Sequence, residues 1–131
     1  MSMQALVEVT WPETDPKADV EWREVCSIDD VLPGAGVAAL LDGEQIAIVR
    51  TRSDQWFALS NFDPFSNAFV IARGIVGDRA GIAKIASPIY KQNFSLETGL
   101  CLDDPSVRLQ VFPIRVVAGR VQVSLHSKVA G

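Results

Sequence analysis

The side chains best suited to chemistry in this chain are few and far apart. There are two cysteines, Cys26 and Cys101, and a single histidine, His126. Together with a carboxylate they could in principle hold a metal ion, but they lack the short pair spacing of a zinc site. Ser87 has no histidine near it in the sequence to act as a base, and we expect His126 to be solvated in the C-terminal tail. These residues predict no catalytic centre and no metal site.

A glycine pair offers a second candidate site, for a nucleotide. The run Gly74-Ile75-Val76-Gly77 is followed by Asp78 and Arg79. A phosphate-binding loop needs a strand-loop-helix context and a Lys-Ser/Thr pair, and both are missing here. We therefore interpret the two glycines as turn markers and predict no cofactor-binding site in this chain.

Length and composition predict one globular domain. A chain of 131 residues, 48% of them hydrophobic and 21% charged, can bury a core without a disulfide framework. The net charge of -4, with scattered basic residues, argues against a nucleic-acid or anionic-membrane partner. No apolar run approaches the roughly 18 residues of a membrane span, and the first residues do not resemble a secretion signal. We expect a cytoplasmic protein with two reduced, buried thiols.

Short β-rich segments follow one another at a spacing typical of an antiparallel sandwich or barrel. We predict residues 1–19 to be an extended or partly disordered arm, residues 20–125 the β-domain and residues 126–131 a tail. Trp11 in the arm either packs on its own domain or inserts into a partner. The expected strands and turns are a strand and helical turn at 20–30, a hairpin of 37–41 and 44–51 through Asp42-Gly43, strands at 55–60 and 82–86, and a closing hairpin of 109–117 and 120–125 through Ala118-Gly119.

One stretch, residues 87–99, resembles the second ligand loop of a Rieske iron–sulfur domain. In that family the loop reads Cys-Pro-x-His and leads into Phe-Asp-x-x-Thr-Gly. Pro88, Phe94, Thr98 and Gly99 match this frame. The resemblance implies an all-β, Rieske-like antiparallel β-sandwich or barrel, with its two former ligand loops at one end.

The four ligand positions of that frame are all substituted. Ser87 and Tyr90 stand at the Cys and His of the second loop, and Asn61 and Asp63 stand at the Cys and His of the first. A Rieske cluster needs two thiolates and two imidazoles, which one chain with a single histidine cannot supply. We expect an apoprotein in which these positions are vestigial.

Three further runs, at residues 73–78, 86–92 and 101–105, are similar to the small subunit of assimilatory NAD(P)H-dependent nitrite reductase. That resemblance implies an accessory subunit that is not catalytic by itself. Its partner would be a large subunit with FAD, an iron–sulfur cluster and siroheme, which reduces nitrite to ammonium with NAD(P)H. The alternative is a cluster-free, Rieske-like interaction module outside nitrite reduction.

The former ligand loops carry an apolar and aromatic set that predicts a docking surface for the large subunit. Aromatic side chains commonly contribute most at the centre of an interface. Phe62, Phe65 and Tyr90 could instead fill the space that a cluster would occupy. The expected partner-binding residues are Phe62, Phe65, Ile89, Tyr90 and Lys91.

Overall fold

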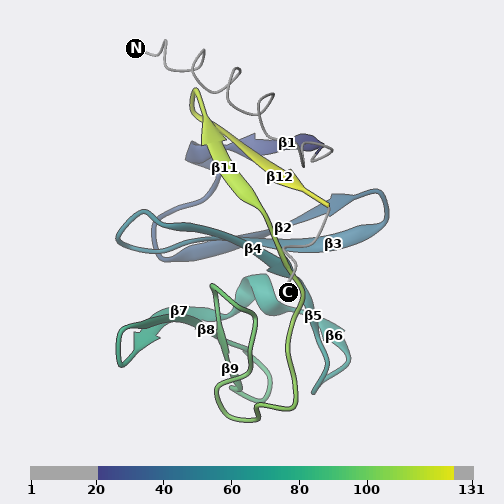
Figure 1. Cartoon of the computed structure of the whole chain (residues 1–131), viewed down its shortest axis with the longest axis vertical. Coiled ribbons are helices and arrows are strands. Elements are labelled where there is room, and N and C mark those ends of the chain that lie inside the picture. The colour runs from purple at the N-terminus through teal and green to yellow at the C-terminus, as the bar shows by residue number, and fades with distance from the viewer. Residues whose placement is uncertain (1–20, 126–131) are drawn as a thin grey trace, which may run out of the picture.

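The computed structural model describes residues 21–125, which form layers of antiparallel strands (Figure 1). This confirms the predicted all-β class. The predicted arm with Trp11 and the tail with His126 lie outside the described residues. The elements are β1 Trp22–Ser27, η1 Ile28–Asp30, β2 Ala35–Leu41, β3 Glu44–Arg50, β4 Trp56–Ser60, β5 Phe62–Asp63, β6 Ala68–Phe69, η2 Ile71–Arg73, β7 Ile75–Arg79, β8 Ile82–Ala86, β9 Asn93–Ser95, β10 Val111–Phe112, β11 Ile114–Val117 and β12 Arg120–Ser124, where η marks a short 3-10 helix.

A four-stranded sheet in the order β10-β4-β3-β2 divides the interior into two cores. We call the cluster that contains Val121 and Val123 of β12 the upper core, and the cluster that contains Ile85 and Phe94 the lower core. Along β3, Ile46 and Ile48 belong to the upper core, whereas Ala47 and Val49 belong to the lower core. Side chains alternate between the faces of a strand, so a strand buried on both faces has a continuous apolar run. The β2-β3 hairpin turns at Asp42-Gly43 as predicted, with positive φ at both residues.

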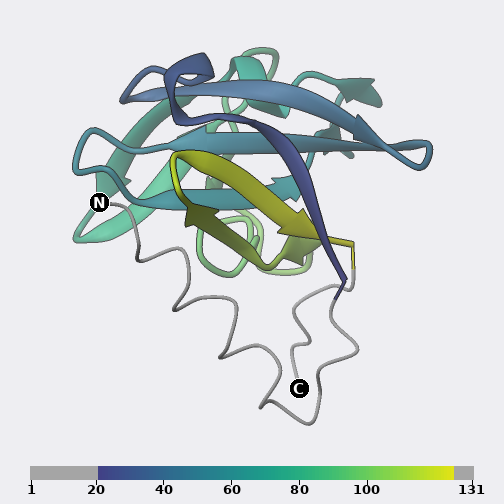
Figure 2. The ribbon, with the colours of Figure 1, turned by 90° about the horizontal axis from the view of Figure 1, so that it is seen from above.

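The upper layer is the sheet β1-β12-β11, which crosses over the four-stranded sheet (Figure 2). Its β11-β12 hairpin turns at Ala118-Gly119 as predicted. The start and the end of the described chain lie side by side in this layer, because Trp22 pairs with Ser124 across β1 and β12.

The prediction of one strand over residues 109–117 was wrong. Pro113 interrupts it, so that β10 pairs with β4 and β11 pairs with β12. Proline has no N–H to give to a strand ladder, and here it marks the point where the chain changes sheets.

The lower layer contains the sheet β7-β8-β9. The interpretation as a turn marker holds for Gly74, which closes the short helix η2 by donating its N–H to the Ile71 carbonyl at 2.9 Å. It was wrong for Gly77, which lies inside β7, and the turn falls at Ala80-Gly81. Gly74 also permits close packing, because a Cβ atom there would lie 2.3 Å from the Ala86 carbonyl oxygen.

Candidate functional site

The two loops at the vestigial ligand positions are joined by a buried hydrogen bond. Ser87 Oγ donates to Asp63 Oδ2 at 2.5 Å, and both residues are completely buried. Asp63 closes the first loop and Ser87 opens the second, so this bond links segments 24 residues apart in sequence. In the frame of the resemblance, these positions are a His and a Cys that bind the same cluster. Here the side chains bind each other.

Backbone hydrogen bonds fix each loop around this pair. The N–H of Phe65 donates to Asp63 Oδ1 at 2.9 Å, and the N–H of Asn67 donates to the Asp63 carbonyl at 2.7 Å. In the second loop, Lys91 has positive φ and donates its N–H to the Ser87 carbonyl at 3.0 Å. Both carboxylate oxygens of Asp63 therefore have donors, as a buried carboxylate requires.

The other two vestigial positions do not join this contact. Asn61 is buried, but its amide binds elsewhere: Nδ2 donates to Gln45 Oε1 at 3.1 Å, and Oδ1 accepts the Ala72 N–H at 2.7 Å. It thereby anchors the turn η2. Tyr90 is 61% exposed. The structure brings two of the four predicted positions together and separates the others from them.

This donor set does not fit a Rieske cluster. Such a cluster requires two thiolates and two imidazoles, and the facing groups are a carboxylate and a hydroxyl bonded to each other. Cys101 lies in the lower core and Cys26 packs against the upper core, so neither thiol lines this site. Burial, and then the charge of Asp30, raise the pKa of the Cys26 thiol. Within residues 21–125 no three His, Cys, Asp or Glu side chains form a group that could hold a metal ion.

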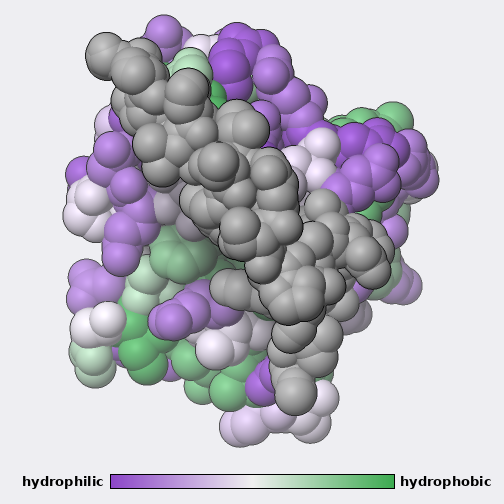
Figure 3. Space-filling view, turned by 45° about the horizontal axis from the view of Figure 1, so that its top comes forward, coloured by the Kyte–Doolittle hydropathy of each residue, from purple (hydrophilic) through white to green (hydrophobic). Residues whose placement is uncertain are grey.

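Beside the buried pair, the loops expose apolar side chains. Ile89 is 44% exposed and Tyr90 61%. Phe62 is half-buried and packs against Phe69, with the rings tilted by 58° and their centroids 5.1 Å apart. Apolar residues gather in the lower half of the space-filling view, whereas its upper half is mostly hydrophilic (Figure 3). We define the docking tip as Phe62, Phe69, Ile89, Tyr90 and Lys91.

The five predicted docking residues have different surroundings. Ile89, Tyr90 and Lys91 are exposed, while Phe65 packs against the lower core, 6.2 Å from the ring of Phe94. Phe69, which is 53% exposed, was missed. It belongs to the tip because β5 and β6 pair Phe62 with Phe69. The available sequence signal was Asn67, since asparagine tolerates the positive φ that it has in the intervening turn.

A polar contact network surrounds Asp103, which belongs to the family-like run 101–105. Asp103 Oδ2 accepts the backbone N–H of Asn93 at 2.7 Å and its side-chain amide at 3.0 Å, and Asp103 Oδ1 binds Arg79 at 3.2 Å. Lys84 Nζ donates to Asn93 Oδ1 at 2.7 Å. The network holds the turn at residues 101–105 against β7 and β9, beside the second loop.

This network predicts a pH dependence of stability. The hydrogen bonds from Asn93, and then the contact with Arg79, lower the pKa of Asp103 in the folded protein. The ionised carboxylate therefore stabilises the fold above the pKa of an unfolded Asp, near 4, and this stabilisation is lost as the pH falls through the lowered value. Asp103→Asn should be slightly less stable than wild type at pH 7, since exposed charges contribute little. Urea titrations should show the difference shrinking below about pH 4; a constant difference at all pH values would contradict this cause.

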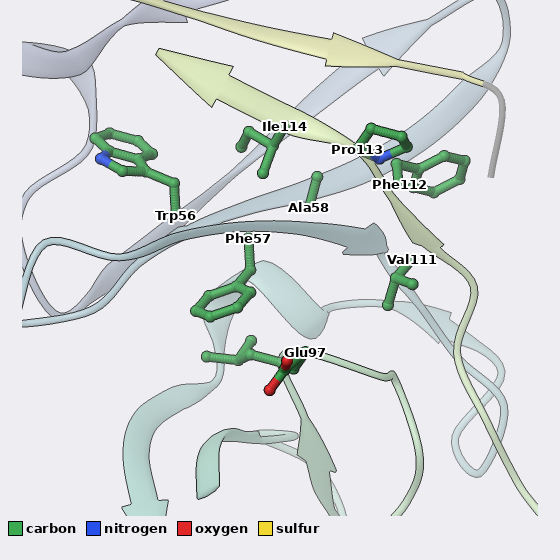
Figure 4. A pocket seen from close by; sticks show the side chains of 9 residues that line it. Trp56, Phe57, Ala58, Glu97, Val111, Phe112, Pro113 and Ile114 are labelled. Carbon is green, nitrogen blue, oxygen red and sulfur yellow. The ribbon is translucent and has the colours of Figure 1, made fainter. Parts of the chain in front are cut away.

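A separate hollow lies where Pro113 diverts the chain (Figure 4). Its walls are aromatic and aliphatic, and among the residues that the structure describes Glu97 is the one charged residue that lines it. A lone carboxylate without a nucleophile or a second titratable group does not make a reaction site. The lining residues are Trp56, Phe57, Ala58, Leu96, Glu97, Val111, Phe112, Pro113 and Ile114.

Comparison with known proteins supplies a family for this geometry. Residues 21–124 match the model of the Rieske-like [2Fe-2S] domain. The chain is 47% identical over 104 residues to the nitrite reductase (NADH) small subunit of Salmonella typhimurium, covering 79% of this chain and 96% of that relative. The NMR structure of the Escherichia coli protein NirD superposes with a TM-score of 0.75 at 44% identity, covering 82% of this chain and 98% of that chain.

A longer relative contains a similar region. The nitrite reductase large subunit of Klebsiella oxytoca is 37% identical over 102 residues, which cover 78% of this chain and 11% of that protein. Within residues 21–125, no helix is long and apolar enough to cross a membrane.

Proposed function

Because this chain belongs to the Rieske-like domain family and, within it, to the nitrite reductase small subunits, we propose that it is an accessory subunit that binds the catalytic large subunit of an NAD(P)H-dependent nitrite reductase. One observation carries this proposal. In the Klebsiella oxytoca relative, a region similar to this domain is part of the large-subunit chain itself. A domain that one protein carries covalently is a natural binding partner where it is a separate chain.

The chemistry belongs to the large subunit in this proposal. We propose that it carries FAD, an iron–sulfur cluster and siroheme, as the family resemblance implies, and that these groups reduce nitrite to ammonium with electrons from NAD(P)H. The present chain contributes a rigid surface. Its former ligand loops are held by the Asp63–Ser87 bond, and the docking tip beside them presents the apolar and aromatic contact area that an interface centre requires. We place the complex in the cytoplasm, where thiols such as Cys26 and Cys101 stay reduced.

Co-purification tests the proposal. The tagged chain, expressed together with the large subunit from the same source, should retain that subunit on an affinity column, and the complex should oxidise NADH or NADPH in a nitrite-dependent manner. If the two proteins separate cleanly at low salt and activity is indifferent to the small chain, the proposal fails. The alternative of an interaction module outside nitrite reduction would then stand.

We also expect the purified chain to be colourless and free of stoichiometric iron. The facing groups Asp63 and Ser87 are hard oxygen donors that bind each other, and they cannot replace thiolates on iron. The measurement is an absorbance spectrum with iron analysis, and a ferredoxin that retains two Cys and two His, expressed in the same host, is the positive control. Two irons per chain with visible absorbance bands would contradict this expectation.

A further inference from the structure

Within residues 21–125, no strand pairs with the outer edge of β2. β2 is the last strand of the sheet order β10-β4-β3-β2. In β3, the carbonyl of Gln45 faces β4 because it accepts the Asn61 N–H, and the carbonyl of Arg50 faces β2 because it accepts the Gly34 N–H. Backbone groups of successive residues point to opposite sides of a strand, so even-numbered residues of β3 face β2.

The register of the β2-β3 pair then identifies the outward-facing residues. The even-numbered residues of β3 stand opposite odd-numbered residues of β2, as Ile48 does opposite Val37. The N–H and C=O groups of Gly36, Ala38 and Leu40 therefore point away from β3. Ala38 is exposed, and Leu40 is 68% exposed.

β2 differs from the other edges in lacking protection. Proteins block the edges of sheets with charges, prolines and bulges. Among the described residues, the edge strand β1 has charges and a bulge, β7 and β11 have charges, and β10 is two residues long and ends at a proline. The other edge strands, β5, β6 and β9, have only two or three residues, and β9 is bridged further at Phe94 by Cys101. The seven residues of β2, Ala-Gly-Val-Ala-Ala-Leu-Leu, include no charge and no proline, and their register with β3 is regular.

We propose that β2 pairs with β2 of a second copy of this chain, antiparallel and about a two-fold axis at Ala38, so that two four-stranded sheets become one. The register follows from the three residues of β2 whose backbone groups face outward, Gly36, Ala38 and Leu40. Centring the pair on Ala38 sets Gly36 opposite Leu40 of the second copy and uses the outward groups of all three residues. Any other register leaves some of them unpaired.

Side-chain size fits this register. The exposed Leu40 side chain would lie next to Gly36 of the second copy, which has no side chain. An ideal Cβ atom at Gly36 would be only 2.8 Å from the carbonyl oxygen of Ala72 in η2, so the position accepts no larger residue of its own. The second copy would cover the Leu40 side chain, which is 68% exposed in the single chain.

Charge fits the same register. Antiparallel pairing about Ala38 brings Asp42 of one copy opposite Gly34 of the other. Arg52 lies against Gly34, with Nε 3.1 Å from an ideal Cβ position there, and it makes no ion pair within residues 21–125. Asp42 binds Arg23 in its own chain. Each end of the paired strands would therefore join an acidic and a basic side chain.

Sedimentation velocity and light scattering on the full chain test the proposal. The average mass should rise toward twice the monomer mass as concentration increases roughly a hundredfold. Ala38→Pro removes an outward N–H and keeps the bonds to β3, so it should raise the dimer dissociation constant at least about tenfold. Arg52→Glu should weaken the dimer as well, and more at low salt.

A matched control separates pairing from general surface effects. Leu40→Lys should disrupt the dimer, since an edge lysine blocks strand addition, whereas Val116→Lys on the exposed face of β11 should leave it intact. Circular dichroism and thermal melts establish that each variant is folded. A wild-type chain that stays monomeric over the whole concentration range, or an Ala38→Pro variant that dimerises equally well, overturns the proposal. The edge would then be covered by something other than a second copy.

Discussion

Replacing Ile89 with Ser and Tyr90 with Ala together should weaken binding to the large subunit by about 2 kcal/mol or more, roughly thirtyfold in the dissociation constant. Both side chains are exposed at the end of the second loop, 44% and 61% respectively, so they contribute little to their own core. Burying an aliphatic and a tyrosine side chain at the centre of an interface contributes on this scale. Isothermal titration calorimetry or surface plasmon resonance with the isolated large subunit measures the effect.

The melting temperature of the isolated domain provides the internal check. It should stay almost unchanged in the double variant, and Val116→Ser, which alters an exposed aliphatic residue in the upper layer, should bind like wild type. If the melting temperature falls sharply and the folded fraction binds with unchanged affinity, Ile89 and Tyr90 are packing residues. The docking surface would then have to be sought elsewhere, beginning with the N-terminal arm around Trp11.

The second large effect concerns stability. Asp63→Ala should lower the free energy of unfolding by about 3 kcal/mol, because it leaves the buried Ser87 hydroxyl and the Phe65 N–H without their acceptor. Urea denaturation of Asp63→Ala, Ser87→Ala and the double variant forms a thermodynamic cycle. We expect a coupling energy of about 1–3 kcal/mol between the two side chains, as for residues in one buried network.

Two further substitutions serve as controls for Asp63→Ala. Asp63→Asn keeps an oxygen for the Phe65 N–H and should be much milder than Asp63→Ala. Asp104 accepts from the N–H and the hydroxyl of Ser106 in an exposed turn, so Asp104→Ala removes a similar local motif without burial and should change stability little. Additive effects of Asp63→Ala and Ser87→Ala would show that the two loops are held by other contacts.

Sequence patterns predicted the parts of the fold that depend on local chemistry. Asp42-Gly43 and Ala118-Gly119 turn where expected, because tight hairpins need residues that accept positive φ. The change of sheets at Pro113 was missed, since one apolar run can serve two sheets and only the tertiary partners distinguish them. β7 was missed because Gly77 looks like a turn residue, although a strand at a sheet edge accepts it.

The site was predictable in position and less so in its contacts. The frame around Ser87 located both loops, yet nothing in the sequence indicated that Asp63 would bind Ser87 while Asn61 bound the backbone of Ala72. Those choices depend on which polar groups the fold buries together. The same limit applies to two aromatic residues of the β5-β6 hairpin: Phe65 in its turn packs inward, whereas Phe69 in β6 is exposed.

Because Trp22 pairs with Ser124, the described chain enters and leaves the domain at adjacent points. A domain whose entry and exit points adjoin can be appended to another chain, or inserted into one, without any change in the path of its own backbone. The docking tip belongs to the loops around β5 and after β8, away from β1 and β12, so it stays free in either arrangement. A short tether alone raises the local concentration of an appended domain to the order of millimolar, so that even a weak contact with the carrier chain would be formed most of the time.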